Sequence, residues 1–377
     1  MTTHLVRSID IAGRRAGDGC PPFIIAEAGV NHNGSTEMAL RLVGAAKEAG
    51  ADAVKFQTFY AHEVVTGDGR KAGYQEAATG AGSQFEMLRA LELSDDGHLA
   101  VRERCRELGI LFLSTPHGHI SSLRRLAALE VPAFKFGSGD LTNIPLLEEA
   151  SLMGKPMLVS TGMASRKEIV EAVCRIRGTN PQVPLALFHC TSAYPCPQEE
   201  SRLRAITVLR MLFPDLHIGF SDHTEGSEAA VFACRMGARI FEKHLTLDRG
   251  LPGPDQRASL DPQGFVEYAS AIRTEAFASE ASSRKIPHAE VGRYLRIFSG
   301  PDDPFARSPG ELALRDVARK SLVLARLAPA GHVLREEDLT VKRPGTGIPP
   351  KRLASFIGRK ASRELLADHL LREEDVV

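Results

Sequence analysis

The feature that most constrains the fold is a regular alternation of short apolar runs with amphipathic stretches. The runs have the continuous hydrophobicity of strands buried on both faces, and the stretches between them have helical periodicity. Eight such runs cover residues 23–27, 53–58, 110–115, 133–137, 157–160, 185–189, 216–221 and 239–244. This pattern predicts an α/β protein, a (β/α)8 TIM barrel that is closed by a helix over residues 262–278.

An open, doubly wound sheet is the alternative to a barrel. Such a sheet normally has fewer strands and a glycine fingerprint after its first strand, which residues 28–34 lack. Two segments fall outside the alternation. Residues 1–19 predict a loose lead-in or a marginal edge strand, and the glycine-rich residues 62–83 predict either a lid or disorder.

Charge balance and cysteine spacing limit the partners and the compartment. The 377 residues include 47 Lys and Arg against 47 Asp and Glu without a basic block, which argues against binding to nucleic acid. The six cysteines are scattered and the N-terminus lacks the pattern of a signal peptide, so a cytoplasmic location is expected. No apolar run approaches the roughly 20 residues that span a bilayer, so no membrane partner is expected.

Polar and ionisable side chains stand where the apolar runs end. In a parallel barrel these ends gather on one face, where barrel enzymes have their active sites. In chain order the ends carry Glu27, Lys55 with Gln57, Thr115, Lys135 with Ser138, Ser160 with Thr161, His189 with Thr191, His223, and Glu242 with His244. We therefore expect an active site at this face.

Two lysines lie inside apolar runs, Lys55 in Ala-Val-Lys-Phe and Lys135 in Phe-Lys-Phe. Because a buried ammonium group is costly unless an anion neutralises it, each should point into the barrel toward negative charge. One lysine could form a structural ion pair with Glu27 or Glu242. Two lysines among hydroxyl groups favour a cradle for a phosphate or carboxylate dianion. The neighbouring hydroxyls are those of Thr115, Ser138 and Ser160.

His223 and His244 follow neighbouring strand candidates that are separated by one helical stretch, so their imidazoles could share a divalent cation. Two arbitrary histidines more often cap strands by hydrogen bonding, but the adjacent Asp222 and Glu242 favour a metal site. These residues predict a metal-dependent enzyme that acts on a small phosphorylated or carboxylated substrate. They leave open an aldolase, an isomerase, a hydrolase and a phosphoenolpyruvate-condensing enzyme.

An ordered set of motifs resembles those of the sialic acid (N-acetylneuraminate) synthase family. The motifs occupy residues 25–34, 54–58, 114–116, 135–139, 160–163, 190–195, 219–223 and 252–255. The resemblance implies condensation of phosphoenolpyruvate with the open-chain aldehyde of an N-acyl hexosamine, such as N-acetylmannosamine, to give a nine-carbon 2-keto acid and phosphate. A legionaminic or pseudaminic acid synthase acting on a di-N-acyl trideoxyhexose, or an enzyme for a 6-phosphorylated sugar, is the alternative. A non-catalytic binding or scaffold protein on the same fold is a remoter one.

The resemblance also implies a role for each site residue. His223 and His244 would hold Mn2+ or Mg2+, Glu242 would activate water, and Glu27, with Asp255 nearby, would bind sugar hydroxyls. The positions that match phosphoenolpyruvate binding, with Ser192 beside them, are Lys55, Thr115, Lys135, Ser138, Ser160 and Tyr194. Tyr194 could instead be a packed aromatic before a proline. Four other histidines are expected to be structural or to support the ligands from behind, namely His32, His117, His119 and His189.

The composition changes after the barrel. Residues 1–280 form the predicted synthase domain, residues 281–314 a Ser-, Arg- and Pro-rich linker with a short helix at 291–298, and residues 315–377 a small β-rich domain. Residues 327–339 and 365–376 echo each other, which predicts two pseudo-symmetric halves. This segment resembles the antifreeze-like (SAF, β-clip) domain of sialic acid synthases.

In that family an arginine on a loop of the small domain reaches the sugar's N-acyl group in the partner subunit's barrel. Arg343, in the loop of residues 342–348, matches it and implies a domain-swapped homodimer, although a solvated loop charge is the simpler interpretation. Three departures from the family pattern leave the sugar open. They are Gln256 where histidine is common, His117-Gly118 where Phe-Asp is common, and the enlarged linker.

Overall fold

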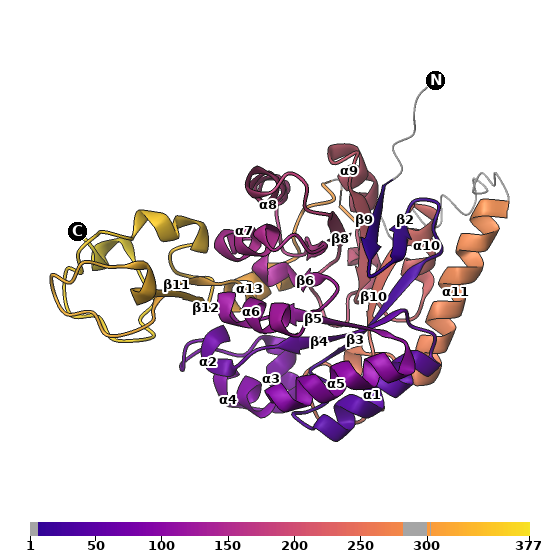
Figure 1. Cartoon of the computed structure of the whole chain (residues 1–377), viewed down its shortest axis with the longest axis horizontal. Coiled ribbons are helices and arrows are strands. Elements are labelled where there is room, and N and C mark those ends of the chain that lie inside the picture. Colours follow the sequence, from indigo (N-terminus) through magenta and orange to yellow (C-terminus); the bar gives the residue numbers. More distant parts are fainter. Residues whose placement is uncertain (1–6, 282–299, 302) are drawn as a thin grey trace.

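The centre of the molecule is a closed barrel of eight parallel strands in sequence order, in which β10 pairs with β3 (Figure 1). The computed structural model describes residues 7–281, 300–301 and 303–377. The strands are β3 (Phe23–Gly29), β4 (Ala53–Thr58), β5 (Leu111–Pro116), β6 (Phe134–Phe136), β7 (Met157–Ser160), β8 (Leu185–His189), β9 (His217–Asp222) and β10 (Ile240–His244). The predicted barrel is confirmed, with each strand within two residues of its expected ends.

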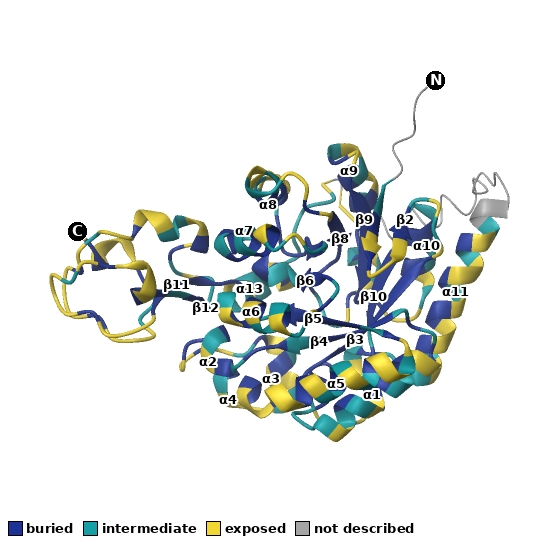
Figure 2. Ribbon diagram, in the orientation of Figure 1, coloured by how far each residue is buried: buried dark blue, intermediate teal, exposed yellow. Residues whose placement is uncertain are grey.

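Helices surround the barrel and turn their apolar faces to it (Figure 2). They are α1 (Thr36–Glu48), α5 (Asp95–Leu108), α6 (Ile120–Ala128), α7 (Ile144–Leu152), α8 (Arg166–Thr179), α9 (Arg204–Leu212), α10 (Glu228–Arg235) and α11 (Pro262–Ala281). Several begin at a serine whose hydroxyl accepts a hydrogen bond from a backbone N–H of the first turn, as Ser35, Ser94 and Ser165 do. These caps and the helical periodicity of the apolar residues explain why the helices could be predicted from the sequence.

The N-terminal segment is a β-hairpin, with β1 (Ser8–Ile11) antiparallel to β2 (Arg14–Gly17). Its Ile9, Ile11 and Ala16 are buried in one apolar cluster with barrel residues such as Phe23 and Leu158. The hairpin therefore packs against the barrel as a stable element. For residues 7–19 the expectation of a loose lead-in was wrong because it overlooked the alternating apolar side chains, and the alternative of a strand was right except that the strand is not marginal. Residues 1–6 lie outside the described residues.

The excursion after β4 is ordered. It contains α2 (Ala61–Val64) and α3 (Gly73–Thr79), and α4 (Gln84–Ala90) follows it. Apolar side chains of α2 and α4, including Val64, Met87 and Leu88, pack with Val30 and Phe59 in a separate cluster. Of the two interpretations of this segment, disorder is wrong, because these contacts bind it to the barrel.

The C-terminal domain pairs β11 (Ser321–Leu324) with β12 (Leu339–Lys342) around an apolar core of its own. The two echoing segments are built alike. In each, a buried aspartate contacts the imidazole of a histidine six residues before it, at 2.8 Å for His332 and Asp338 and at 2.7 Å for His369 and Asp375. The repeat in the sequence thus corresponds to a repeated structural turn.

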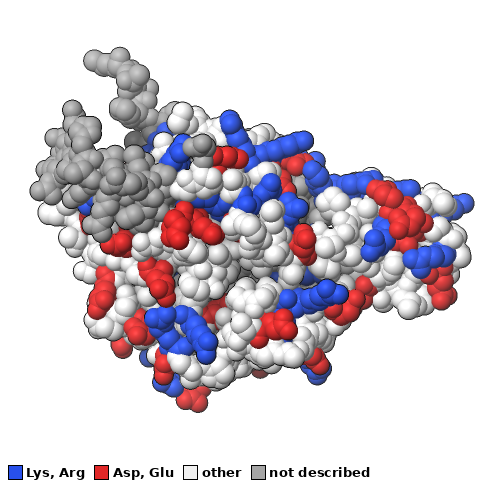
Figure 3. All heavy atoms as spheres, turned by 180° about the vertical axis from the view of Figure 1, so that it is seen from behind, with Lys and Arg blue, Asp and Glu red and all other residues white. Residues whose placement is uncertain are grey.

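Helix α13 (Pro309–Ala318) lies between the barrel and the small domain, and it crosses the boundary at residue 314 that we expected. The short helix predicted at residues 291–298 lies outside the described residues. Helices long and apolar enough to cross a membrane do not occur in the part of the chain that the structure describes. Basic and acidic side chains are mixed irregularly over the described part of the face in Figure 3.

Candidate active site

A cavity of about 140 Å³ lies at the carboxyl ends of the barrel strands. Of the strand-end residues expected at the site, Thr161, His189 and Thr191 do not line the cavity, whereas every residue to which the resemblance gave a role in binding or catalysis does. The residues with such a role are Glu27, Lys55, Thr115, Lys135, Ser138, Ser160, Ser192, Tyr194, His223, Glu242, His244, Asp255 and Arg343. The structure therefore brings together side chains from positions 27 to 343 of the chain.

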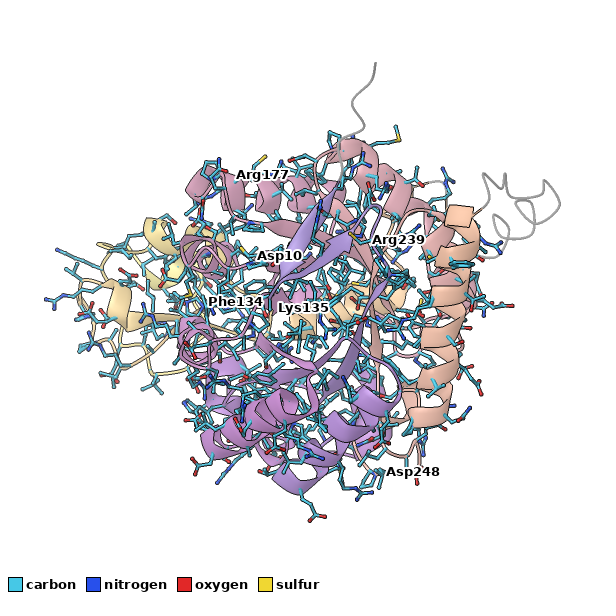
Figure 4. The ribbon with its side chains drawn as sticks, turned by 45° about the vertical axis from the view of Figure 1, so that its right-hand side comes forward. Asp10, Phe134, Lys135, Arg177, Arg239 and Asp248 are labelled. Carbon is cyan, nitrogen blue, oxygen red and sulfur yellow. The ribbon has the colours of Figure 1, made fainter. Side chains whose placement is uncertain are left out.

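The alternation of side chains along the strands aims the lysines inward. On β6, Phe134 and Phe136 pack outward in the cluster between strands and helices, so the intervening Lys135 points into the barrel (Figure 4). On β4, Val54 and Phe56 do the same around Lys55. Both lysines are almost fully buried, as the sequence predicted.

Two buried carboxylates neutralise the lysines. Lys55 Nζ lies 2.6 Å from Glu27 Oε2 and 3.9 Å from Glu242 Oε2, and Lys135 Nζ lies 3.3 Å from Glu242 Oε1. Hydroxyls accept further hydrogen bonds from the ammonium groups, that of Thr115 at 3.0 Å and that of Ser160 at 2.8 Å. The structural ion pairs with Glu27 and Glu242, which were the alternative to an anion cradle, are therefore present. Their charged groups face the cavity rather than the closed core of the barrel.

The two carboxyl groups differ in their electrostatics. Burial raises the pKa of Glu27 to about 7, although the charge of Lys55 acts against it. Burial would also raise the pKa of Glu242, but the charges of Lys135 and Lys55 outweigh it and hold that pKa at about 2. Glu242 is therefore a carboxylate near neutral pH, whereas the carboxyl group of Glu27 can be either protonated or ionised when a ligand binds.

Hydroxyl groups at the strand ends form two separate hydrogen bonds. Ser138 Oγ lies 2.9 Å from Ser192 Oγ, and Ser221 donates to Glu242 Oε1 at 3.1 Å. Gly139 belongs to the same rim, and a Cβ at this position would lie 2.8 Å from the carbonyl oxygen of Ala318 in α13. Only glycine allows this close approach of the linker helix to the loop that carries Ser138.

His223 and His244 lie side by side at the cavity, with ring centroids 5.7 Å apart. His223 Nδ1 donates to the carbonyl oxygen of Thr191 at 2.6 Å, which leaves Nε2 as the free coordinating nitrogen. Burial lowers the pKa of both imidazoles, so both are neutral and able to coordinate a cation. Asp255 Oδ2 lies 3.9 Å from His244 Nδ1. Asp222, which favoured a metal in the sequence, is instead paired with Lys243 at 3.1 Å.

The donor set fits a partly open metal site. In the part of the chain that the structure describes, no group of three or more His, Cys, Asp and Glu side chains forms a closed ligand set. Two neutral imidazoles, one of them oriented by a backbone carbonyl, would leave most coordination positions to water and substrate. A divalent cation that must contact a substrate needs this arrangement.

Aromatic rings close one side of the cavity. The ring of Tyr194 lies 4.3 Å from that of His223 and 5.1 Å from that of Tyr74, measured between centroids. Tyr194 therefore faces the site and is not only a packing residue. Tyr74 comes from α3 in the glycine-rich excursion, where no periodic pattern of residues identifies it.

Arg343 reaches the cavity from the small domain. It is buried, its backbone N–H donates to the carbonyl oxygen of Val64 at 2.8 Å, and its side chain contacts His117 and Gln84. We expected this arginine in the partner subunit's barrel, whereas in the single chain it lies at its own barrel. The reason is the path of α13, which crosses the mouth of that barrel. The interpretation of Arg343 as a solvated charge is wrong.

Glu311 of α13 anchors this crossing. Its fully buried carboxylate pairs with Arg202 and accepts hydrogen bonds from the backbone N–H groups of Ser192, at 3.1 Å, and Met163, at 3.4 Å. Residue 311 was expected in a linker, and its role as an anchor was not predicted. A signal was present, because Ser308 and Glu311 form a capping box at the start of the helix.

The remaining histidines and the departures from the family pattern separate into two groups. His32, His119 and His189 do not line the cavity, in agreement with the structural role expected of them. Gln256 is fully buried and donates to the carbonyl oxygen of Asn31 at 3.1 Å, so it supports a loop behind the site. His117 does line the cavity, which the expectation of a structural role did not foresee.

Comparison with known proteins agrees with the architecture. A family model described as NeuB family matches residues 42–283, and a SAF domain model matches residues 319–377. The chain is 39% identical over 358 residues to N,N'-diacetyllegionaminic acid synthase of Legionella pneumophila, covering 94% of each protein. It is 32% identical over 363 residues to human N-acetylneuraminate-9-phosphate synthase, covering 96% of this chain and 94% of the relative. The crystal structure of the spore coat polysaccharide biosynthesis protein SpsE of Bacillus subtilis superposes with a TM-score of 0.80 at 31% identity, covering 98% of this chain and 99% of the other.

These matches extend over both domains and over nearly the whole length of the relatives. They agree with the cavity, which lies where a barrel enzyme of this kind would have its site. The chain belongs to the NeuB family, and it is a phosphoenolpyruvate-dependent condensing transferase with a C-terminal SAF domain.

Proposed function

We propose that this enzyme joins phosphoenolpyruvate to the open-chain aldehyde of an N-acyl hexosamine and releases phosphate and a nine-carbon 2-keto acid. The observation that supports this most is the pair of buried lysines, Lys55 and Lys135, which face the same cavity of about 140 Å³ as the imidazoles of His223 and His244. One side of this cavity suits an anion, and the other suits a cation that contacts a carbonyl oxygen.

The lysine side of the cavity binds phosphoenolpyruvate in this proposal. Lys55 and Lys135, with the hydroxyls that they contact, hold its phosphate and carboxylate groups and orient C3 toward the aldehyde carbon. The C3–C bond forms as the aldehyde oxygen takes up negative charge and C2 becomes cationic. Water then adds to C2 as Glu242 accepts one of its protons, and that proton goes on to the oxygen of the former aldehyde. The C2–O bond to phosphate then breaks while the C2 hydroxyl forms the keto group and gives its proton to the departing phosphate.

The charge balance of the cavity supports a divalent cation. Its lining includes three cationic side chains, Lys55, Lys135 and Arg343, and three acidic ones, Glu27, Glu242 and Asp255. An incoming phosphoenolpyruvate anion would leave an excess of negative charge in a buried site, which is unfavourable unless a cation accompanies it. His223 and His244 would hold this Mn2+ or Mg2+, whose chemistry is to polarise the aldehyde oxygen.

The opposite side of the cavity receives the sugar. Asp255 would bind sugar hydroxyls together with Glu27, which also pairs with Lys55 at the anion side, and Arg343 would donate to a carbonyl oxygen of an N-acyl group. N-Acetylmannosamine, a di-N-acyl trideoxyhexose and a 6-phosphorylated N-acyl sugar are the three candidate substrates. Relatives are named both as N,N'-diacetyllegionaminic acid synthase and as N-acetylneuraminate-9-phosphate synthase, so their names do not choose between an uncharged and a phosphorylated sugar.

The oligomeric state is a separate prediction. The resemblance implied a domain-swapped homodimer, whereas the loop of Arg343 contacts the barrel of its own chain in the structure. Light scattering on the eluting protein would measure the state of assembly. Mixing Arg343→Ala protein with His223→Ala protein at low sugar concentration would show which barrel the loop serves.

The test of the proposed function is a product assay. The purified enzyme is incubated with phosphoenolpyruvate, Mn2+ and each candidate sugar, and phosphate and keto acid are measured. We expect equimolar phosphate and keto acid with one class of sugar. Release of phosphate without keto acid would contradict the condensation. Failure to bind phosphoenolpyruvate in the presence of Mn2+ would instead favour the non-catalytic alternative.

A further inference from the structure

Arg343 differs from every other buried cation in the described part of the chain. Seven lysines and arginines are buried there, and six of them lie within 4 Å of a carboxylate oxygen. The six pairs are Lys55–Glu27, Lys135–Glu242, Arg202–Glu311, Lys243–Asp222, Arg319–Glu168 and Lys320–Asp140. The Arg343 guanidinium has only neutral partners among the described residues, so it retains donors for a ligand in the cavity that it lines.

The main neutral partner is His117. Arg343 Nη2 lies 2.6 Å from His117 Nε2, and Arg343 Nη1 donates to Gln84 Oε1 at 3.4 Å. A guanidinium group only donates, so His117 Nε2 must accept, and the proton of the neutral ring is on Nδ1. Burial, together with the charges of Arg343 and Lys320, lowers the pKa of His117 well below its usual value and keeps the ring neutral.

The imidazole of His117 is held in place from behind. Lys320 Nζ donates to the carbonyl oxygen of His117 at 2.7 Å, and Asp140 Oδ2 lies 4.0 Å from His117 Nδ1. The ring also packs edge-on against Phe59, with centroids 6.0 Å apart. Asp140 and Lys320 pair with each other at 2.9 Å, so neither supplies free charge to the cavity. His117 is thus a fixed acceptor on which the guanidinium can be oriented.

The wall beside Arg343 is apolar. Helix α4 places Gln84 at its start and Met87 and Leu88 one turn later, and all three line the cavity together with Val30 and Leu91. A ligand group at this position meets one guanidinium and several hydrocarbon side chains. An acyl group, whose carbonyl oxygen accepts and whose alkyl part packs, matches both features. A phosphate dianion would need a further unpaired cation.

We propose that His117 is a positioning residue that orients Arg343 toward the acyl carbonyl of the sugar. Because the other buried cations of the described residues are already paired with carboxylates, the cavity then favours uncharged N-acyl sugars over 6-phosphorylated ones. The inference rests on the proposed function and deepens it by naming the substrate class. It concerns the substrate choice of this chain, since His117 stands where the family pattern differs.

The test compares variants of His117 in steady-state assays. His117→Phe keeps a ring but lacks an acceptor, whereas His117→Gln retains an acceptor oxygen. We expect His117→Phe to raise the KM of the N-acyl sugar about 10-fold or more, with the KM of phosphoenolpyruvate within about twofold of wild type. His117→Gln should recover most of the loss. His117→Leu is a second variant without an acceptor, should His117→Phe fold poorly, and His62→Phe, on an exposed histidine, is the matched control.

A double-variant comparison separates positioning from general damage. If His117 acts through Arg343, Arg343→Lys should cost less in the His117→Phe background than in wild type. The sugar panel contains N-acetylmannosamine, its 6-phosphate and a 2,4-di-N-acetyl trideoxyhexose. Wild type should prefer an uncharged sugar to the 6-phosphate at least about 10-fold in kcat/KM, and His117→Phe should reduce this preference.

The outcomes distinguish the two levels of the proposal. An unchanged sugar KM in His117→Phe and His117→Leu, an equal rise in both KM values, or a wild-type preference for the 6-phosphate would overturn the inference while condensation still occurs. Absence of keto acid with every sugar of the panel, in wild type, would overturn the proposed function itself.

Discussion

The two ends of the cavity neutralise their cations in different ways. At the anion end, Lys55 and Lys135 project from strands of the barrel and pair with Glu27 and Glu242. At the sugar end, Arg343 comes from a loop of the small domain, and its partners are neutral groups from segments that follow the strands. The barrel thus supplies a fixed charged framework, and the loops supply the groups that meet the variable substrate.

If the proposed function is right, this difference would explain how one family can act on several sugars. Relatives that cover most of this chain are named as synthases of N,N'-diacetyllegionaminic acid, N-acetylneuraminate 9-phosphate and pseudaminic acid. Loop positions tolerate substitution more readily than buried strand positions, so the sugar end can change while the anion end remains. The comparison predicts that substitutions at the two ends affect different substrates.

Removal of the imidazole pair should have the largest effect, because it affects both ends. We expect chelation to abolish turnover, Mn2+ to restore it in wild type, and His223→Ala or His244→Ala to lose about 1000-fold or more in kcat/KM whether or not Mn2+ is added. His62→Ala serves as the control. Substantial activity in His244→Ala would show that the two imidazoles do not hold the cation.

A substitution at the anion end should have the second largest effect on the kinetics. Lys135→Met keeps the volume of the side chain but removes its charge, and we expect the KM of phosphoenolpyruvate to rise about 100-fold. The KM of the sugar should stay within about threefold of wild type. Thermal unfolding of the variant checks that the barrel is intact. If both KM values rise together in a folded variant, the division of the cavity is wrong.

A substitution at the sugar end should give the converse result. Arg343→Ala should raise the sugar KM about 10- to 100-fold, because a hydrogen bond from a charged donor is lost, and should leave the KM of phosphoenolpyruvate near the wild-type value. The steady-state parameters of both substrates measure this. An effect on phosphoenolpyruvate alone would place the arginine at the anion end instead.

A mixed-subunit experiment should show the smallest change. Arg343→Ala and His223→Ala proteins are combined under conditions in which subunits exchange, and activity is assayed at low sugar concentration. Since Arg343 contacts its own barrel in the structure, we expect no activity above the sum of the two proteins. Recovery of a sizeable fraction of wild-type activity would show that the loop serves the partner's barrel, as in a domain-swapped homodimer.

The sequence predicted the anion end well, for a physical reason. A lysine inside an apolar run is costly to bury, so Lys55 and Lys135 stand out without any knowledge of the fold. Their partners also lie at strand ends, and the barrel topology brings all strand ends to one face. The eight alternating apolar and amphipathic segments therefore predicted both the fold and the residues in this half of the site.

The sugar end could not be assembled from the sequence in the same way. Gln84 and His117 contact Arg343 across 259 and 226 positions of the chain, and no periodic pattern connects them. Tyr74 lies in a glycine-rich segment whose two interpretations were a lid and disorder. Such contacts depend on how a loop packs, which residue spacing does not encode.

Calorimetric titration of phosphoenolpyruvate into two variants, in the presence of Mn2+, tests the division of the cavity most directly. Arg343→Ala should bind phosphoenolpyruvate with the affinity of wild type, and Lys135→Met should bind it about 100-fold more weakly or not measurably. Equal weakening in both variants, or wild-type affinity in Lys135→Met, would contradict an anion end built on the barrel and a sugar end built on the loops.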